Sequence, residues 1–272
     1  MLDVRQIETF VLNAPGNCVS ERDAITPQAA GVRLFDPPIF AVGDPDDPLF
    51  AGLKRPEAVG PHLLLPRDWL PEARSVLSFF LPFSDAVKSS NAAPPGDFPS
   101  PLWLHGRIEG QAFLLDLCRE LVRLLEREGA VSVVPAMDSR FWTVSPPQPA
   151  TGALCYTSNW SERHAAFICG LGTFSLSRGV ITEKGVCGRF GSLITTAVLP
   201  VTVRLYHDLE EYCIHCGACA RNCPGGAISL EQGKQHPPCY DFQASILDRT
   251  APRYGCGKCQ VSVPCMSKIP GK

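Results

Sequence analysis

Eight cysteines lie close together near the end of the chain, and five others are scattered before them. The first four of the eight follow the pattern Cys213-x2-Cys216-x2-Cys219-x3-Cys223-Pro224. Gaps of two residues let one tight loop present three thiolates to a 4Fe–4S cluster, whereas the fourth cysteine ligates a different cluster. The proline helps to turn the chain away from the site. The motif therefore predicts a pair of clusters.

A second cluster needs further thiolates, and the sequence supplies four more after the motif. In two-cluster ferredoxins the fourth cysteine of a motif crosses over to the other cluster. The same logic divides the eight cysteines into two complete sets with none left over. The first cysteine group is Cys213, Cys216, Cys219 and Cys265, and the second cysteine group is Cys223, Cys239, Cys256 and Cys259.

Zinc is the alternative occupant, because four cysteines in two CxxC pairs make a zinc ribbon. The triple spacing that ends in Cys-Pro is more typical of iron–sulfur proteins and favours clusters. Cys265 is the irregular member, since five residues separate it from Cys259 and Pro264 comes directly before it. If Cys265 does not reach the site, the first cluster keeps three protein ligands.

Several motifs resemble those of epoxyqueuosine reductases, whose architecture reductive dehalogenases share. In the tail, the resemblance rests on the Cys213–Pro224 motif, on Cys239 and on Tyr254-Gly255-Cys256-x2-Cys259-Gln260. Upstream, three segments are similar to that family's cobalamin-binding core, namely Ala73-Arg74-Ser75-Val76, Gly170-Leu171-Gly172 and Gly191-Ser192-Leu193-Ile194-Thr195. The resemblance covers most of the chain from about residue 60 onward.

The resemblance implies an α+β fold class, with a nitroreductase-like α/β core over residues 1–206 and a small two-cluster ferredoxin-like domain over residues 207–272. It also implies cobalamin between the two parts, with electrons passing from one cluster to the other and then to cobalt. Reduced ferredoxin or flavodoxin would be the electron donor. Cobalamin contacts in this family are largely made by the backbone, and the candidate cofactor-binding residues are Gly170, Gly172, Gly188, Gly191 and Ser192.

Three departures from the family pattern bear on the substrate. Epoxyqueuosine reductases have an Asp proton donor in a Val-Asp-x-x-Pro segment, and Tyr156 stands at the matching position here. A phenol can also donate a proton, so Tyr156 is the candidate catalytic residue; the alternative is a half-buried tyrosine with one hydrogen bond. Thr173-Phe174-Ser175 replaces the family's Gly-Lys, and the chain stops at Lys272 without the helical repeats that serve tRNA. These departures argue against tRNA-directed reduction.

The elements that must position these residues follow from hydrophobic periodicity. Val76–Leu81 is an apolar, aromatic-rich run and predicts a buried strand that ends near Pro82. Helical spacing over Ile108–Glu128, followed by Gly129 as a cap, predicts a long helix. The prolines of residues 91–101 predict a surface loop and candidate lid. The other expected elements are strands at Val131–Val134, Phe174–Thr182 and Ser192–Leu199, with glycines 185, 188 and 191 joining the last two, and a short helix at Ser161–Gly170.

Composition limits the remaining possibilities. The 272 residues, 45% of them hydrophobic, suit one large domain and a small one. A net charge of −2 gives no general basic face, so nucleic acid is not an expected partner. The N-terminus has no export signal, and the longest apolar stretch, Ser192–Val203, is too short to span a bilayer. We expect a cytoplasmic protein without a membrane partner.

Other side chains allow two interpretations each. His105, Arg107 and Glu109, at the start of the expected long helix, either hold an anion or are ordinary helix-start polarity. Arg163 and His164 line a pocket or are solvated. His215, between two cluster ligands, is expected to tune a cluster or pair at the surface rather than bind iron. Five cysteines lie outside the cluster framework, namely Cys18, Cys118, Cys155, Cys169 and Cys187. Of these, Cys118 is an expected core residue, and Cys155 and Cys169 flank the expected site.

Two functions of different classes follow. The leading hypothesis is an iron–sulfur oxidoreductase, a cobalamin-dependent reductase of a small molecule that resembles epoxyqueuosine reductase. The alternative is an electron-transfer, ferredoxin-like protein with a degenerate core that binds no corrin. A truncated epoxyqueuosine reductase is a third possibility. Iron and cobalt content after reconstitution separates the first two hypotheses.

Overall fold

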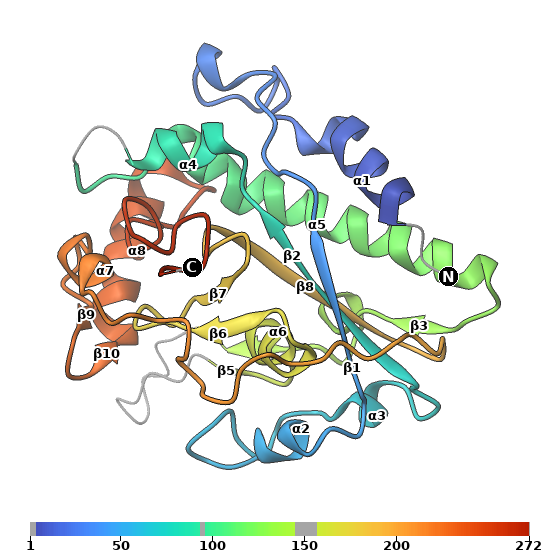
Figure 1. Ribbon diagram of the computed structural model, residues 1–272. Helices are drawn as coiled ribbons and strands as arrows, with labels where there is room; N and C mark the ends of the chain where they lie inside the picture. Colours follow the sequence, from blue (N-terminus) through green and yellow to red (C-terminus); the bar gives the residue numbers. More distant parts are fainter. Residues whose placement is uncertain (1–3, 93–95, 145–156, 272) are drawn as a thin grey trace.

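A four-stranded antiparallel sheet forms the centre of the core, in the computed structural model that describes residues 4–92, 96–144 and 157–271 (Figure 1). The strand order is β1-β2-β8-β3. The two central strands pair along their full length, with Ser75 opposite Thr195 and Pro82 opposite Gly188. The strands are β1 (Ile39–Gly43), β2 (Ser75–Pro82), β8 (Gly188–Thr195) and β3 (Ser132–Val133).

Both faces of this sheet are covered by helices, and every residue of β2 is buried. Leu77 and Phe79 pack into the core that contains the long helix α5 (Pro101–Arg127). Val76 and Phe80 pack into a second core with α6 (Glu162–Cys169). Because successive side chains of a strand point to opposite faces, α5 and α6 lie on opposite sides of the sheet. The buried strand expected over Val76–Leu81 is confirmed.

The long helix begins earlier than predicted. Ser100 is its N-cap, and the Ser100 hydroxyl accepts a hydrogen bond from the Trp103 backbone N–H at 3.1 Å. Pro101 lies in the first turn rather than in a loop, because a missing N–H costs nothing there. The start expected near Ile108 is therefore wrong. His105 follows the four residues whose N–H groups lack helical partners, so no anion site forms at its backbone.

The chain between α6 and β8 also differs from the prediction. The single strand expected over Phe174–Thr182 is a hairpin of β6 (Gly172–Phe174) and β7 (Val180–Thr182). A turn separates them, in which the Arg178 N–H donates to the Ser175 carbonyl at 2.7 Å. The next strand, β8, begins at Gly188 rather than Ser192, so two glycines expected in a connection are part of the sheet.

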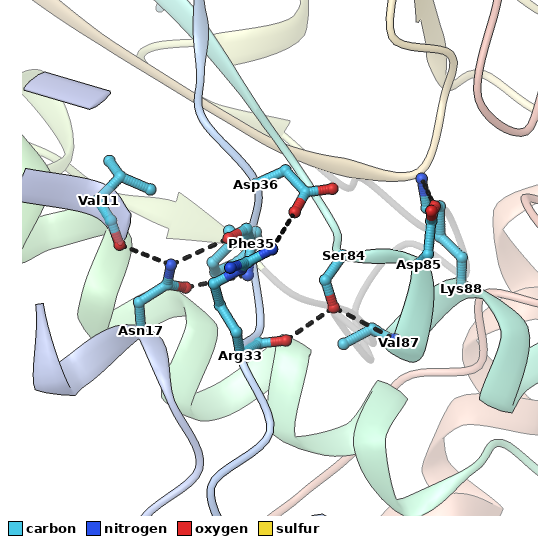
Figure 2. Close-up of polar contacts among 9 residues, drawn as sticks. All are labelled: Val11, Asn17, Arg33, Phe35, Asp36, Ser84, Asp85, Val87 and Lys88. Atoms are coloured by element: carbon cyan, nitrogen blue, oxygen red, sulfur yellow. Dashed lines mark hydrogen bonds and ion pairs between the residues drawn. The ribbon is translucent and has the colours of Figure 1, made fainter. Parts of the chain in front are cut away.

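The N-terminal segment packs against α5 through α1 (Val4–Asn13) and η1 (Pro15–Asn17). The buried Asn17 side chain holds it in place (Figure 2). Its amide donates to the carbonyls of Val11 at 2.8 Å and Phe35 at 3.0 Å, and its oxygen accepts from the Phe35 N–H at 2.9 Å. This polar group is satisfied by the backbone and has a structural role.

The C-terminal module lies beside the N-terminal end of α5 and beside α4 (Asp85–Ala92) (Figure 1). Its elements are α7 (Ala218–Arg221), β9 (Ile228–Ser229), β10 (Gly233–Lys234) and α8 (His236–Thr250). No helix in residues 4–92, 96–144 or 157–271 combines the length and apolar character that a membrane crossing requires. The remaining elements are η2 (Pro27–Ala29), α2 (Pro48–Gly52), α3 (Pro66–Trp69), η3 (Pro135–Met137), β4 (Thr143–Val144) and β5 (Thr157–Ser158).

The expected mixture of helices and sheet followed by a small cysteine-rich segment is confirmed. The nitroreductase-like character of the core and the boundary between residues 206 and 207 stay predictions.

Candidate functional site

One hollow in the C-terminal module collects four cysteines. It encloses about 350 Å³, part of it open to solvent, and apolar side chains such as Leu176, Ile181 and Val263 form much of its wall. The cysteines that line it are Cys213, Cys216, Cys219 and Cys265. These are the four members of the first cysteine group.

Cys265 reaches this hollow in spite of its irregular spacing. The Val186 N–H donates to the Cys265 carbonyl at 2.9 Å, which fixes the five-residue loop against the core. Burial, and then the nearby thiols of Cys213 and Cys219, raise the pKa of Cys265 to about 12. The irregular spacing alone leaves open whether Cys265 can reach the first cluster. In the structure, the contact with Val186 directs the loop so that Cys265 lines the hollow.

The second cysteine group lies together as well. Burial, and to a smaller extent the thiols of Cys259, Cys223 and Cys239, raise the pKa of Cys256 to about 12, although a hydrogen bond from the Lys258 backbone acts in the opposite direction. Burial also raises the pKa of Cys259, while the Lys234 ammonium acts in the opposite direction. Cys259 in turn affects Cys219 of the first group, so the two groups are neighbours.

N–H groups already point at two sulfurs of the second group. The Ala227 N–H lies 3.2 Å from Cys223 Sγ, and the Gln243 side-chain amide lies 3.2 Å from Cys239 Sγ. Such donors stabilise a thiolate and raise the potential of a cluster that the thiolate binds.

The spacing of these groups bears on which metal centre they fit. In the part of the chain that the structure describes, no three Cys, His, Asp or Glu side chains converge on a single metal ion. A tetrahedral zinc site needs its sulfurs roughly 3.8 Å apart, given zinc–sulfur bonds of about 2.3 Å. A cubane cluster separates its ligands further, because each thiolate binds a different iron. The choice of a cluster over zinc therefore rests on the Cys-x2-Cys-x2-Cys-x3-Cys-Pro pattern.

The second group is held against α4 and α5. The Asn91 side-chain amide donates to the Cys256 carbonyl at 3.0 Å, and Lys258 Nζ donates to the Asn91 carbonyl at 3.0 Å. Gly257 has a φ of 66°, and a Cβ there would lie 1.8 Å from the Trp103 ring. The Cys256–Cys259 loop therefore fits flat on the start of α5 only with glycine at this position.

The first group is held against the other side of the core. The Cys187 thiol donates to the Gln260 carbonyl at 2.8 Å. Lys88 Nζ donates to the Ser267 hydroxyl at 3.2 Å. A Cβ at Gly185 would lie 2.4 Å from the Met266 carbonyl oxygen. The module is thus attached to the core by close contacts on both sides of its cysteines.

The glycines expected to contact a cofactor have another explanation in the structure. A Cβ at Gly191 would lie 2.4 Å from the Phe79 ring, and one at Gly188 would lie 2.5 Å from the Phe80 ring. A Cβ at Gly172 would lie 1.9 Å from the Ile181 carbonyl oxygen. Aromatic rings of β2 that pack against β8, together with a tight hairpin, therefore account for these glycines.

The other two candidate cofactor residues are also used by the fold. Gly170 ends α6 with a φ of 107° in the left-handed region. Ser192 is fully buried; its hydroxyl accepts from Trp160 Nε1 at 2.9 Å and donates to a Glu162 carboxyl oxygen at 2.6 Å. The Cβ positions or side chains of all five candidates contact the protein itself, and their contact with a corrin through backbone atoms stays a prediction.

Glu162 is a candidate functional residue that carries no signal in the sequence. Burial raises the pKa of Glu162 to about 8, although hydrogen bonds from Ser192 and Trp160 act in the opposite direction. Only the fold brings the Ser192 hydroxyl to it, thirty residues further along the chain. No motif or spacing marks this carboxyl.

The remaining sequence candidates lie in varied positions. Tyr156 and Cys155 lie outside the described residues. His105 is buried, and its Nε2 accepts from the Ile25 N–H at 3.0 Å, while its Nδ1 lies 3.1 Å from a Glu109 oxygen. His215 pairs with Glu210 at 3.4 Å on the surface. Cys118 is buried on α5, as expected of a core residue.

Arg163 and His164 occupy the first turn of α6. Arg163 keeps an exposed side-chain surface, which limits the desolvation that lowers its pKa. Burial, and then the Arg163 charge, lower the pKa of His164 to about 4. The Arg163 guanidinium lies within electrostatic range of Cys259 and Cys239. The structure therefore places Arg163 beside the second cysteine group.

Comparison with known proteins agrees with the cysteine chemistry. The family model for a 4Fe-4S binding domain matches residues 207–229. No curated protein matches the chain by sequence. Among solved structures, the epoxyqueuosine reductase from Streptococcus thermophilus has 16% identity and a TM-score of 0.49 over 86% of this chain, which spans 64% of that enzyme's length.

Two further structures are similar at the same level. The epoxyqueuosine reductase from Bacillus subtilis has 18% identity and a TM-score of 0.47, covering 98% of this chain and 67% of that one. A catabolic reductive dehalogenase has 15% identity and a TM-score of 0.48, covering 73% of this chain and 26% of that one. The chain thus contains a 4Fe-4S binding domain, and its structural neighbours are the two kinds of enzyme that its motifs resemble.

Proposed function

We propose that this protein is an iron–sulfur reductase in which two 4Fe–4S clusters deliver single electrons to a small-molecule site in the core. The observation that carries the proposal is the attachment of both cysteine groups to the core. Asn91 holds the Cys256 loop against α4, and Val186 holds Cys265 beside β8. A free electron carrier has no need for such contacts with a core of about two hundred residues.

The positions of the two groups suggest the direction of electron flow. Cys216 of the first group is exposed, which suits docking of an external donor such as reduced ferredoxin or flavodoxin. The second group lies beside α5 and beside the Arg163 guanidinium of α6. Electrons would therefore enter at the first cluster and leave from the second. In that arrangement the module supplies the electrons and the core holds the molecule that receives them.

Cobalamin as the final electron carrier rests on the sequence resemblance. The residues expected to contact it, such as Gly188 and Gly191, pack against core aromatic rings, and their role in binding it stays a prediction. We therefore assign no step to a corrin, and the identity of the acceptor stays a prediction. The electron carrier with a degenerate core is the second candidate.

Anaerobic reconstitution tests the proposal. The full chain is loaded with iron and sulfide, with and without cobalamin, and its visible spectrum and metal content are recorded. We expect about eight irons per chain, and a reductase that uses a corrin would also retain base-off cobalamin. Full iron without bound cobalt would remove the corrin from the proposal. Full iron with no reduction of any tested small molecule by the dithionite-reduced protein would favour the carrier.

A further inference from the structure

Three arginines approach one another where the core meets the second cysteine group. Arg107 lies on α5, Arg163 on α6 and Arg189 on β8. Desolvation, and then the Arg107 charge, lower the pKa of Arg189 to about 9, and the Arg163 charge adds to this. Desolvation and Arg107 also lower the pKa of Arg163. Three guanidinium groups therefore share one region and repel one another.

Helix geometry brings two of them together independently of charge. Gln111 follows Arg107 by four residues, so both side chains leave the same face of α5 about 5–6 Å apart. The Gln111 side-chain oxygen accepts a hydrogen bond from Arg189 Nη2. Arg107 itself is fixed by Tyr254, whose hydroxyl accepts from Arg107 Nη2 at 2.9 Å and whose ring lies 4.7 Å from the guanidinium carbon.

None of the three has an anionic side chain as a partner in residues 4–92, 96–144 and 157–271. The ion pairs found there involve other arginines; on the same helix, for example, Arg119 pairs with Asp116 and Arg123 with Glu120. The undescribed segment 145–156 contains no Asp or Glu in its sequence. The buried Nε of Arg189 costs free energy as long as no acceptor joins it.

Most of their donors are also unused. A guanidinium has five N–H donors, whereas Arg163 makes one weak bond, to the Arg178 carbonyl at 3.3 Å. Arg189 bonds Gln111, and its buried Nε has no partner among the described residues. An unpaired buried donor usually marks a missing partner. Carboxylate and phosphate groups fit the planar fork of arginine through two parallel hydrogen bonds.

We propose that Arg107, Arg163 and Arg189 bind the carboxylate or phosphate group of a small-molecule ligand at the junction of the core and the second cysteine group. As a statement about the substrate, this rests on the proposed reductase function. As a statement about an anion site, it rests on the three side chains alone. A ligand anchored there would lie beside the cluster from which electrons leave.

The cluster itself is a competing anion. Arg163 is influenced by Cys259 and Cys239, so part of its charge would compensate four iron-bound thiolates. The groups that shift Arg189 are Arg107, Tyr254 and Arg163. Arg189 is therefore the residue that separates the two roles.

Calorimetric titration of the cluster-loaded full chain tests the proposal, with inorganic phosphate and acetate as probes at low salt. We expect one site per chain. Arg189→Gln should weaken binding of the preferred probe about 10- to 100-fold, the loss of a charge-assisted bidentate contact. Arg119→Gln, which removes an exposed arginine of α5, should leave binding unchanged. Arg189→Lys keeps the charge without the fork and should give an intermediate loss.

The preferred probe identifies the ligand class, because phosphate favours a phosphorylated ligand and acetate a carboxylic acid. If the parent protein binds neither probe, the proposal is overturned. If Arg189→Gln leaves binding intact and instead lowers a cluster reduction potential in an EPR-monitored titration, the arginines serve the cluster and the proposal is also overturned. Anion binding without any reductase activity would leave the site standing and remove the proposed function.

Discussion

Replacing Cys223 by alanine is expected to abolish the same cluster that is lost when Cys256 is replaced, although Cys223 belongs in sequence to the first motif. The iron content should fall by about half in each variant, from about eight to about four. The physical reason is the fold of the loop. Cys223 lies with Cys256 and Cys259, whereas the hollow of the first group contains Cys219 and Cys265.

The EPR spectrum of the reduced variants reports which cluster remains. Cys223→Ala and Cys256→Ala should share one spectrum, and Cys219→Ala and Cys265→Ala should share another. Cys18→Ser, which changes a cysteine far from both groups in sequence, should keep the full iron content. A Cys223→Ala spectrum identical to that of Cys219→Ala would show that the assignment is not crossed. Full iron in Cys265→Ala would mean that the first cluster has another fourth ligand.

The second large expected effect is a dependence of the free energy of unfolding on pH, caused by ionisation of Glu162. Burial raises the pKa of this carboxyl in the folded protein to about 8, above its ordinary value of 4.5. Between these two pH values the folded state binds more protons than the unfolded state, so the free energy of unfolding falls as pH rises. Below pH 4.5 the contribution is fully present, and above about pH 8 it is lost.

Glu162→Gln should remove this dependence. The Gln carbonyl oxygen can accept the same hydrogen bond from Ser192, and no charge forms as pH rises. At pH 8 the variant should be more stable than the parent by about 1–3 kcal/mol. For a chain of this size that is several degrees of thermal midpoint, at roughly 2–4 °C for each kcal/mol.

The measurement is the thermal midpoint of the cluster-loaded protein at pH 5.5 and pH 8. Glu126→Gln, on the exposed end of α5, is the matched control and should follow the parent. Equal slopes for the parent and Glu162→Gln would show that Glu162 ionises normally in the folded protein.

The sequence predicts those parts of the molecule in which local spacing determines structure. Gaps between cysteines indicate which sulfurs share a loop, so the 4Fe-4S domain is evident from the spacing alone. The apolar run at Val76–Leu81 likewise predicts β2, because burial on both faces leaves no alternation.

The errors arise where one residue type has two uses. A proline-rich run predicts a loop at Pro101, but proline is equally suited to the first turn of a helix. Gly188 and Gly191 suggest a connection between two strands. They lie in β8, where the rings of Phe80 and Phe79 fill the space of their side chains. Only the pairing of β2 with β8 reveals which use applies.

The arginine cluster and Glu162 are beyond sequence reasoning for a different reason. Arg107, Arg163 and Arg189 come from three elements, and their approach depends on how α5 and α6 meet the end of the sheet. The sequence marks Arg107 as a possible anion ligand and Arg163 as a possible pocket residue, but nothing in it connects either of them with Arg189. Glu162 is similarly marked only by its contact with Ser192.

The central claim is that this chain carries two 4Fe–4S clusters in its C-terminal module. The most direct test is iron and acid-labile sulfide analysis of the anaerobically reconstituted full chain, together with EPR after dithionite reduction. The account predicts about eight irons and about eight sulfides per chain, and a spectrum broadened by coupling between two neighbouring paramagnetic clusters. About four irons with an isolated cluster signal, or bound zinc without sulfide, would contradict it.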